Sequence, residues 1–184
     1  MQIIDDFLPQ DQYQFLADLV RSIDFDWHWE AHAASQPEHS AVSGTRGGWV
    51  HLLGNRSHNV RSWALDHFAP VLDQLVARTG LTVARARVTA LQSRWGSSPE
   101  DYLTPHVDYM CAHTTAIYYL DSSDGDTVFF EQVFTGYPQP SEFTVLSRVS
   151  PRANRLVLFD GLQYHTATAP CRSELRVVLN VNLF

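Results

Sequence analysis

The spacing of apolar residues along this chain changes at about residue 81. In two regions of the first 80 residues, apolar side chains recur every three or four positions, which is the period of helices packed on one side. From Leu81 onward they alternate with polar residues or form short β-branched and aromatic runs, as strands do. Helices followed by a succession of antiparallel strands predict an α+β domain with a β-sandwich or a jelly-roll barrel.

Two helical regions are predicted in the first part. One runs from about Pro9 to Ile23, with Leu16, Leu19, Val20 and Ile23 as its apolar stripe. The other starts at Ser57 as N-cap, is kinked or split by Pro70 near Ala69, and ends at Gly80. We expect both to pack against the sheet. A short edge strand at Gln2–Ile4, a loop over Ala33–Gly48 and a strand at Trp49–Leu53 complete this half.

The second part contains a series of short predicted strands. They span Val83–Trp95, Thr114–Leu120, Thr127–Glu131, Phe143–Val149, Arg155–Asp160 and Leu175–Phe184. Asp124-Gly125 has the chemistry of a hairpin turn between the second and third of them. The alternating arginines Arg85, Arg87 and Arg94 are interpreted as the solvated face of the first strand, with a local basic groove as the alternative.

Length and charge limit the number of domains and the classes of function that fit the chain. A chain of 184 residues predicts one domain, residues 1–184, with a helical support region at 1–80 and a jelly-roll core at 81–184. Its net charge is −7 and its 13 basic residues are all arginine, so nucleic-acid binding is disfavoured and lysine chemistry is excluded. Two scattered cysteines, an acidic N-terminus and the lack of a long apolar run predict a protein of the reducing cytoplasm without a membrane span.

The segment around His106, Val107 and Asp108 carries the strongest chemical signal. In an extended strand His106 and Asp108 point to one side and Val107 packs on the other. With the distant His165 they predict the two-histidine, one-carboxylate face that holds Fe(II) and leaves three positions open. His28 and His32 also stand four apart, as on a helix face, but Glu30 is misplaced for a zinc-protease motif, so a surface role is favoured.

The order of features from about Leu103 to Phe184 resembles the iron(II)- and 2-oxoglutarate-dependent dioxygenases, in particular the small prolyl-4-hydroxylase-like members of bacteria and phages. The resemblance rests on the H-x-D pair, the strand TTAIYYL, the segment SPRANRLVLFDG, His165, and Arg176 at the start of RVVLNVNLF. It implies a double-stranded β-helix, a jelly-roll or cupin-like barrel, with N-terminal helices packed against the sheet. It also implies that His106, Asp108 and His165 bind Fe(II), and that Arg176 binds the far carboxylate of 2-oxoglutarate.

The alternation of side chains along the last strand supports the assignment of Arg176 to the far carboxylate of 2-oxoglutarate. Arg176, Val178, Asn180 and Asn182 share one face of the last strand, which we assign to the barrel interior; a solvent-exposed edge is the alternative. Arg172 is a competing partner for the carboxylate, although it lies in a more loop-like segment. Tyr118 or Thr127 is expected to add a hydroxyl, with core packing as the other interpretation of each.

The resemblance implies an oxygenase that uses O2 and 2-oxoglutarate to hydroxylate an unactivated C–H bond of a small molecule, an amino acid or a peptidyl substrate, with release of succinate and CO2. Related halogenases replace the carboxylate ligand with a small residue, so Asp108 favours hydroxylation or desaturation. Two alternatives stay open: a non-catalytic jelly-roll sensor that binds a metal or an anion, and a zinc hydrolase that uses the same histidines. The oligomeric state is not readable from the sequence.

Overall fold

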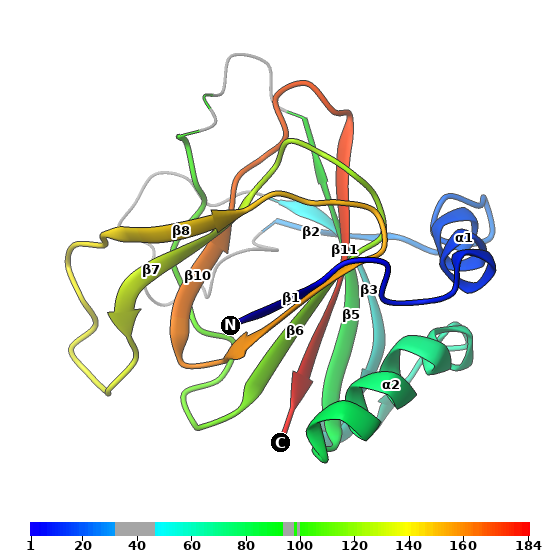
Figure 1. The fold of residues 1–184 in the computed structure, drawn as a ribbon, viewed down its shortest axis with the longest axis horizontal. Coiled ribbons are helices and arrows are strands. Elements are labelled where there is room, and N and C mark those ends of the chain that lie inside the picture. The colour runs from blue at the N-terminus through cyan, green and yellow to red at the C-terminus, as the bar shows by residue number, and fades with distance from the viewer. Residues whose placement is uncertain (32–46, 94–97, 99) are drawn as a thin grey trace.

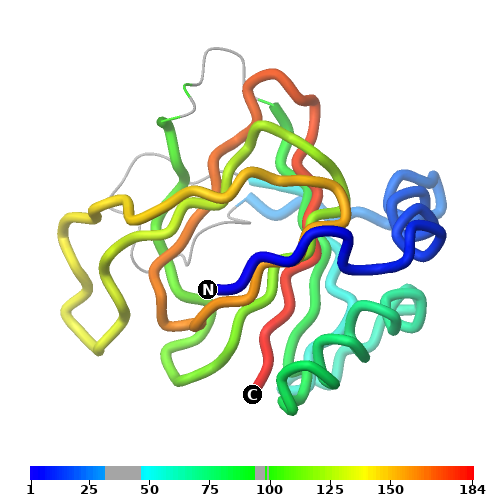
Figure 2. The backbone as a smooth tube through the Cα atoms, in the orientation of Figure 1, coloured from blue at the N-terminus to red at the C-terminus, as the bar shows by residue number. Residues whose placement is uncertain are grey.

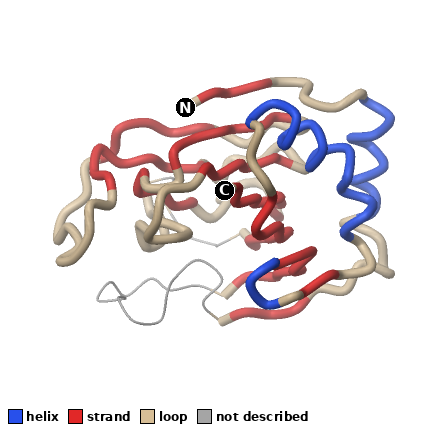
Figure 3. The backbone as a smooth tube through the Cα atoms, turned by 90° about the horizontal axis from the view of Figure 1, so that it is seen from below, coloured by secondary structure: helices blue, strands red, loops and turns tan. Residues whose placement is uncertain are grey.

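The computed structural model describes residues 1–31, 47–93, 98 and 100–184. Strands and loops make up most of this backbone (Figure 3). The helical segments are α1 (Gln10–Leu19), the short 3-10 helices η1 (Arg56–His58) and η2 (Leu65–Phe68), and α2 (Ala69–Thr79). The strands are β1 (Gln2–Ile4), β2 (His28–Glu30), β3 (Gly48–Asn55), β4 (Val60–Arg61), β5 (Val83–Gln92), β6 (Thr114–Tyr119), β7 (Thr127–Val133), β8 (Val145–Val149), β9 (Arg155–Asp160), β10 (Gln163–Ala167) and β11 (Leu175–Leu183).

Most described strands belong to a larger antiparallel sheet with the order β1-β9-β6-β11-β5-β3-β2, in which β4 pairs with β3. Strand β11 lies near its centre, between β5 and β6. The predicted edge strand Gln2–Ile4 is confirmed, because β1 pairs only with β9 along this path and sets Ile3 opposite Val157 (Figure 2). The central position of β11 brings the last residues of the chain into the middle of the molecule.

The smaller described sheet has the order β10-β7-β8 and lies on the side of the molecule opposite the helices (Figure 1). The hairpin predicted at Asp124-Gly125 is wrong, because β6 and β7 belong to different sheets and do not pair. This turn carries the chain from one sheet to the other. The Asp124 carboxylate accepts the backbone N–H groups of Cys171, Arg172 and Ser173, and so ties the turn to the loop before β11.

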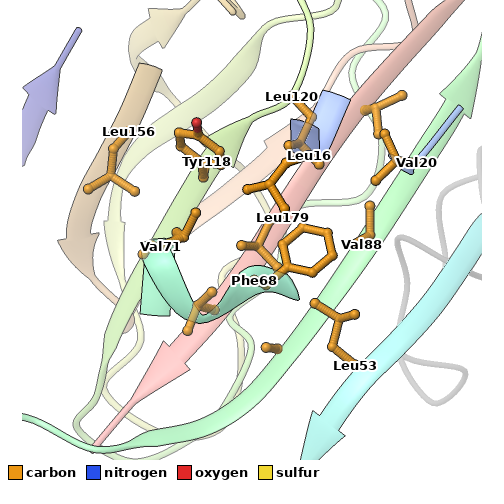
Figure 4. Packing of buried hydrophobic residues seen from close by; sticks show 14 of the residues in the cluster. Leu16, Val20, Leu53, Phe68, Val71, Val88, Tyr118, Leu120, Leu156 and Leu179 are labelled. Atoms are coloured by element: carbon orange, nitrogen blue, oxygen red, sulfur yellow. The ribbon is translucent and has the colours of Figure 1, made fainter. Parts of the chain in front are cut away.

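The outer face of the larger sheet packs against both helices and forms the largest apolar core (Figure 4). Alternate residues of β11 contribute to it, since Val177, Leu179, Val181 and Leu183 are all buried there. A second core fills the space between the two sheets and includes Ile117, Tyr119, Phe129, Val149, Val157, Phe159 and Val178. Two antiparallel sheets with a shared core and few helices are consistent with a jelly-roll fold.

Several predicted boundaries differ from the observed ones. Helix α1 ends at Leu19, and Ile23 is fully exposed instead of continuing the apolar stripe. His28 lies in strand β2, so the helix face proposed for His28 and His32 is wrong; His32 and most of the loop predicted over 33–48 lie outside the described residues. Asn55, not Ser57, caps the 3-10 helix η1, because its side chain accepts the Ser57 N–H.

The predicted effects of Pro70 and Gly80 are confirmed. Pro70 lies in the first turn of α2, directly after η2 ends at Phe68, so the helical region is split where expected. Gly80 ends α2 with a φ of 69°, a left-handed conformation that suits glycine. Within the described ranges, none of the helices has the length and apolar character that a membrane crossing requires.

Candidate metal centre

The two histidines of the site meet through their backbones. His106 and His165, the latter on β10, form an antiparallel bridge in which each N–H donates to the other's carbonyl oxygen at 3.0 Å. Asp108 follows two residues after His106, and Val107 packs on the opposite side in an apolar cluster, as the parity argument predicts. The structure therefore brings together His106, Asp108 and His165, whose potential ligand atoms all lie within 4.8 Å of one another.

Hydrogen bonds orient both imidazoles toward a common point. The Nδ1 atoms of His106 and His165 lie 3.0 Å from the carbonyl oxygens of Thr104 and Gln163. A carbonyl can only accept, so each Nδ1 carries the proton and each Nε2 keeps a free lone pair. Burial lowers the pKa of His165 to about 4 and lowers that of His106 as well. Both rings are thus neutral near pH 7, which is the form that ligates a metal.

The Asp108 carboxylate is held by three side chains from the larger sheet. Arg85 Nη2 donates to Oδ1 at 3.1 Å, while the Nδ2 atoms of Asn180 and Asn182 donate to Oδ2 at 3.2 and 2.8 Å. Burial alone would raise the pKa of Asp108. Coulombic interactions with the two imidazoles in their protonated forms, and with the permanently charged Arg85 and Arg87, outweigh burial and hold the pKa far below its usual range. The carboxylate is therefore ionised.

The interpretation of Arg85 and Arg87 as a solvated strand face is wrong. Both stand on the inner face of β5, where Arg85 pairs with Asp108 and Arg87 lines the cavity beside the histidines. Their positions oppose Asn182 and Asn180 on β11, so the polar positions of two neighbouring strands face the same interior. Arg94 lies outside the described residues.

Arg176 stands at the other end of the same strand face and is buried, with 4% of its surface exposed. Its Nε donates to the Gly125 carbonyl oxygen and its Nη2 to Thr127 Oγ1, each at 2.7 Å. The guanidinium lies 5.7 Å from the centre of the Tyr119 ring, and the Tyr119 hydroxyl contacts Thr127 Oγ1 at 2.7 Å. Thr127 is thus beside Arg176, as predicted, and Tyr119 is a neighbour that the sequence did not single out.

Tyr118 lies on the opposite face of β6 from Tyr119. Its ring belongs to the core under the helices (Figure 4), and its hydroxyl donates to Asn154 Oδ1 at 2.7 Å. The structure does not bring Tyr118 to Arg176, because consecutive strand residues point to opposite faces. Arg172 is exposed in the loop before β11, 3.5 Å from Asp124, and does not line the cavity.

One cavity of about 60 Å³ connects the two ends of this face. Its lining includes both histidines of the cluster and both members of the Arg176–Thr127 pair, together with Arg87, Thr89, Leu91, Ile117, Thr166, Ala167, Val178 and Asn180. A divalent cation at the cluster and an anion at Arg176 would therefore share one space. Among the described residues, His113 stays apart from the cluster, buried against Tyr109 and Phe184.

Comparisons with known proteins show what fold this is. No family model and no curated protein matches the chain. Solved structures do: a Pseudomonas putida prolyl-4-hydroxylase (17% identity, 99% of this chain and 90% of that chain, TM-score 0.62) and a 2OG-Fe(II) oxygenase family oxidoreductase from Burkholderia pseudomallei (11%, 98% and 83%, TM-score 0.63).

A third similar structure is the epimerase SnoN in complex with Fe3+, alpha ketoglutarate and nogalamycin RO, with 15% identity, 99% of this chain and 77% of that chain covered, and a TM-score of 0.62. At these identities the likeness establishes a common fold, and the chain spans most of each of these three proteins.

Proposed function

We propose that this chain is an Fe(II)- and 2-oxoglutarate-dependent oxygenase that hydroxylates a C–H bond of a small molecule, an amino acid or a peptidyl substrate, with release of succinate and CO2. One observation carries the proposal: His106 and His165 of the His106–Asp108–His165 cluster line the same cavity as the buried Arg176, in a fold shared with such oxygenases. In this proposal residues 1–184 form one domain, and its two sheets are the halves of a double-stranded β-helix.

The donor set fits a ferrous ion. Two neutral imidazoles with free Nε2 atoms and one ionised carboxylate would leave half of an octahedral coordination sphere open and the ion with a net charge of about +1. Such a centre attracts a bidentate anion. When bound, iron with 2-oxoglutarate and O2 supplies the oxidising chemistry, while His106, Asp108 and His165 fix its position.

Arg176 would bind the far carboxylate of 2-oxoglutarate. Its bonds to Gly125 and Thr127 use Nε and Nη2 and fix the guanidinium plane, which leaves Nη1 without a bond to the described residues and available to the ligand. Burial lowers the pKa of Arg176, although a guanidinium remains charged near pH 7, and it strengthens a charge-assisted hydrogen bond there. Thr127 and Tyr119 would complete this end of the cavity.

Asp108 determines which oxidation is expected. Its bonds to Arg85, Asn180 and Asn182 hold the carboxylate beside the two histidines, where it would take the coordination position that a halide needs. We therefore favour hydroxylation over halogenation. Asp108→Gly should abolish product formation, because it removes both a ligand and the charge that the three donors hold.

The test is conversion of 2-oxoglutarate to succinate by the full chain with Fe(II) in air, followed by NMR. Wild type and the exposed control Arg78→Gln should both convert it, whereas His165→Ala, Asp108→Gly and wild type without O2 should not. Metal and 2-oxoglutarate binding without conversion would indicate a jelly-roll sensor. An activity that Zn(II) supports without O2 would indicate a hydrolase, and either result would overturn the proposal.

A further inference from the structure

Four residues that line the cavity each have a polar side-chain atom that is sealed from solvent and has no hydrogen-bond partner within the described residues: Arg87 Nε, Thr89 Oγ1, Thr166 Oγ1 and Asn180 Oδ1. Leaving a buried polar atom unpaired costs about 1–3 kcal/mol. Native structures rarely tolerate several such atoms in one place, so their concentration here indicates that ligand groups pair with them when the site is filled.

Arg87 and Asn180 form a pair at the metal end of the cavity. They oppose each other on the neighbouring strands β5 and β11, whereas Arg176 lies four positions from Asn180 along β11. Opposite residues in a sheet have their Cβ atoms about 5 Å apart. A donor, Arg87 Nε, and an acceptor, Asn180 Oδ1, are thus offered together, away from the end assigned to the far carboxylate of 2-oxoglutarate.

Arg87 is not part of a structural ion pair in the described part of the chain. Asp108, a buried acid whose charge acts on Arg87, already accepts hydrogen bonds from Arg85, Asn180 and Asn182. Glu30 also acts on the charge of Arg87, but it is exposed on β2 and makes no contact that would satisfy the guanidinium. Burial, and then repulsion from Arg85, lower the pKa of Arg87, as expected of a cation without a bound counter-ion.

The charge at this end also favours an anion. Arg85 and Arg87 contribute two positive charges, and Asp108 offsets one of them. A ferrous ion would add two more, and the chelating carboxylate of 2-oxoglutarate would remove one, so the loaded site would keep an excess of two positive charges. The chain as a whole carries −7, which makes this local excess a feature of the site.

We infer that Arg87 and Asn180 bind the anchoring end of the primary substrate, and that this end is a carboxylate with a hydroxyl or ammonium donor beside it. Arg87 would grip the carboxylate with Nε and one Nη atom, and Asn180 Oδ1 would accept from the neighbouring donor. The inference rests on the proposed function. It narrows the substrate to a 2-hydroxy acid, a 2-amino acid or a molecule that ends in one.

The carboxylate of 2-oxoglutarate that chelates the metal has the same chemistry and is the alternative source of an anion for Arg87. The two sources differ in one respect that can be measured. If Arg87 serves the substrate, Arg87→Gln should keep the 2-oxoglutarate affinity within about threefold of wild type. If Arg87 serves the co-substrate, the affinity should fall by about tenfold or more, as for a lost charge-assisted bond.

The experiment uses the full chain loaded with Zn(II), an inert and diamagnetic stand-in for iron, and with saturating 2-oxoglutarate. L-Lactate, L-alanine, propionate and L-lactamide are titrated while the arginine Nε–H signals are followed by NMR. Lactate or alanine should bind wild type at least tenfold tighter than lactamide, which lacks the charge, and at least threefold tighter than propionate, which lacks the donor. The preference should persist in Arg78→Gln and disappear in Arg87→Gln.

The outcomes distinguish failure of the proposed oxygenase function from failure of the inferred substrate site at Arg87. Failure of 2-oxoglutarate to bind wild type would count against the oxygenase, whereas acids that then still bind through Arg87 would preserve the anion site. If 2-oxoglutarate binds but no acid does, or if acid and amide bind equally, the inference is wrong. It is also wrong if Arg87→Gln keeps the preference for acids or loses 2-oxoglutarate.

Discussion

The two faces of strand β11, a run of nine residues, bury side chains of opposite chemistry. On the outer face, Val177, Leu179, Val181 and Leu183 pack under the helices and form no polar contact through their side chains. On the inner face, Arg176, Asn180 and Asn182 are just as enclosed, but their side chains hold acids, carbonyls and hydroxyls. The outer face therefore stabilises the fold. The inner face holds buried polar groups in fixed positions, and the fold tolerates this because the outer face stabilises it.

The inner face has a cost that the outer face lacks. Its polar side chains gain little net stability over water, and one of their atoms, Asn180 Oδ1, has no hydrogen-bond partner in the described structure. Burial of Leu179 and its neighbours, at about 25 cal/mol per Å² of apolar surface, offsets this cost. Substitutions on the two faces should thus affect different measurements, which is how the comparison can be tested.

The largest effect is expected from Leu179→Ala on the outer face. It removes a fully buried side chain from the main core, and such changes lower the free energy of unfolding by about 2–5 kcal/mol. Val178→Ala, one residue away on the inner face, removes a smaller buried side chain that borders the cavity and should cost about 1–2 kcal/mol. Urea unfolding measures both values. Equal losses would contradict the division between the faces.

Asn182→Ala should produce the next largest effect, on metal binding. Asn182 accepts from Arg85 Nε at 3.0 Å and donates to Asp108 at 2.8 Å, so it links the arginine to the proposed ligand. Loss of such a support lowers metal affinity by about 10–100-fold. Val181→Ala, its outer-face neighbour, is the control and should leave the affinity of the folded protein unchanged. Calorimetry with Zn(II) that shows similar affinities for the two variants would count against this role.

A smaller effect is expected from Asp124→Asn, which acts on the loop that leads to Arg176. Burial alone would raise the pKa of Asp124, but the N–H donors of Cys171, Arg172 and Ser173 outweigh it and lower the pKa. A carboxylate whose pKa is lower in the folded than in the unfolded protein stabilises the fold at pH values above its unfolded pKa of about 4. This stabilisation is lost as the pH falls through the folded pKa. Wild type should exceed the variant by about 1.5 kcal/mol at pH 7.

The pH dependence of that difference provides the check. The gap in unfolding free energy between wild type and Asp124→Asn should be constant from pH 7 to about pH 5 and shrink below about pH 4 as the carboxylate takes up a proton. A gap that widens in acid would have the wrong sign for a carboxylate with a lowered pKa.

The sequence predicted the site residues of β11 and the metal cluster better than those of β5. The alternation of side chains along β11 and the pairing of His106 with Asp108 follow from spacing, whereas the choice of His165 relied on the family resemblance. The structure places these three ligand candidates together. The sequence could not show that Arg85 and Arg87 face the barrel interior. A strand with alternating polar residues has the same pattern whether its polar face contacts solvent or lines a polar cavity. Only the pairing of β5 with β11 distinguishes the two cases.

Two further misses have local causes. Tyr118 and Tyr119 lie in a run that is apolar on both sides, so periodicity could not tell which ring faces Arg176. Strand β10, which carries His165, is short and polar, and its pairing with β7 defines it rather than its composition. In the same way, pairing with β3 makes a strand of β2, where the four-residue spacing of two histidines suggested a helix face.

The central claim is that the inner face binds iron and 2-oxoglutarate together. Its most direct test is an anaerobic titration of the Fe(II)-loaded chain with 2-oxoglutarate, followed by the visible charge-transfer band of a chelated keto acid. The band should appear in wild type and in Arg78→Gln, require about tenfold more 2-oxoglutarate in Arg176→Gln, and be absent in His165→Ala. A wild-type protein that binds iron but never shows the band would contradict the claim.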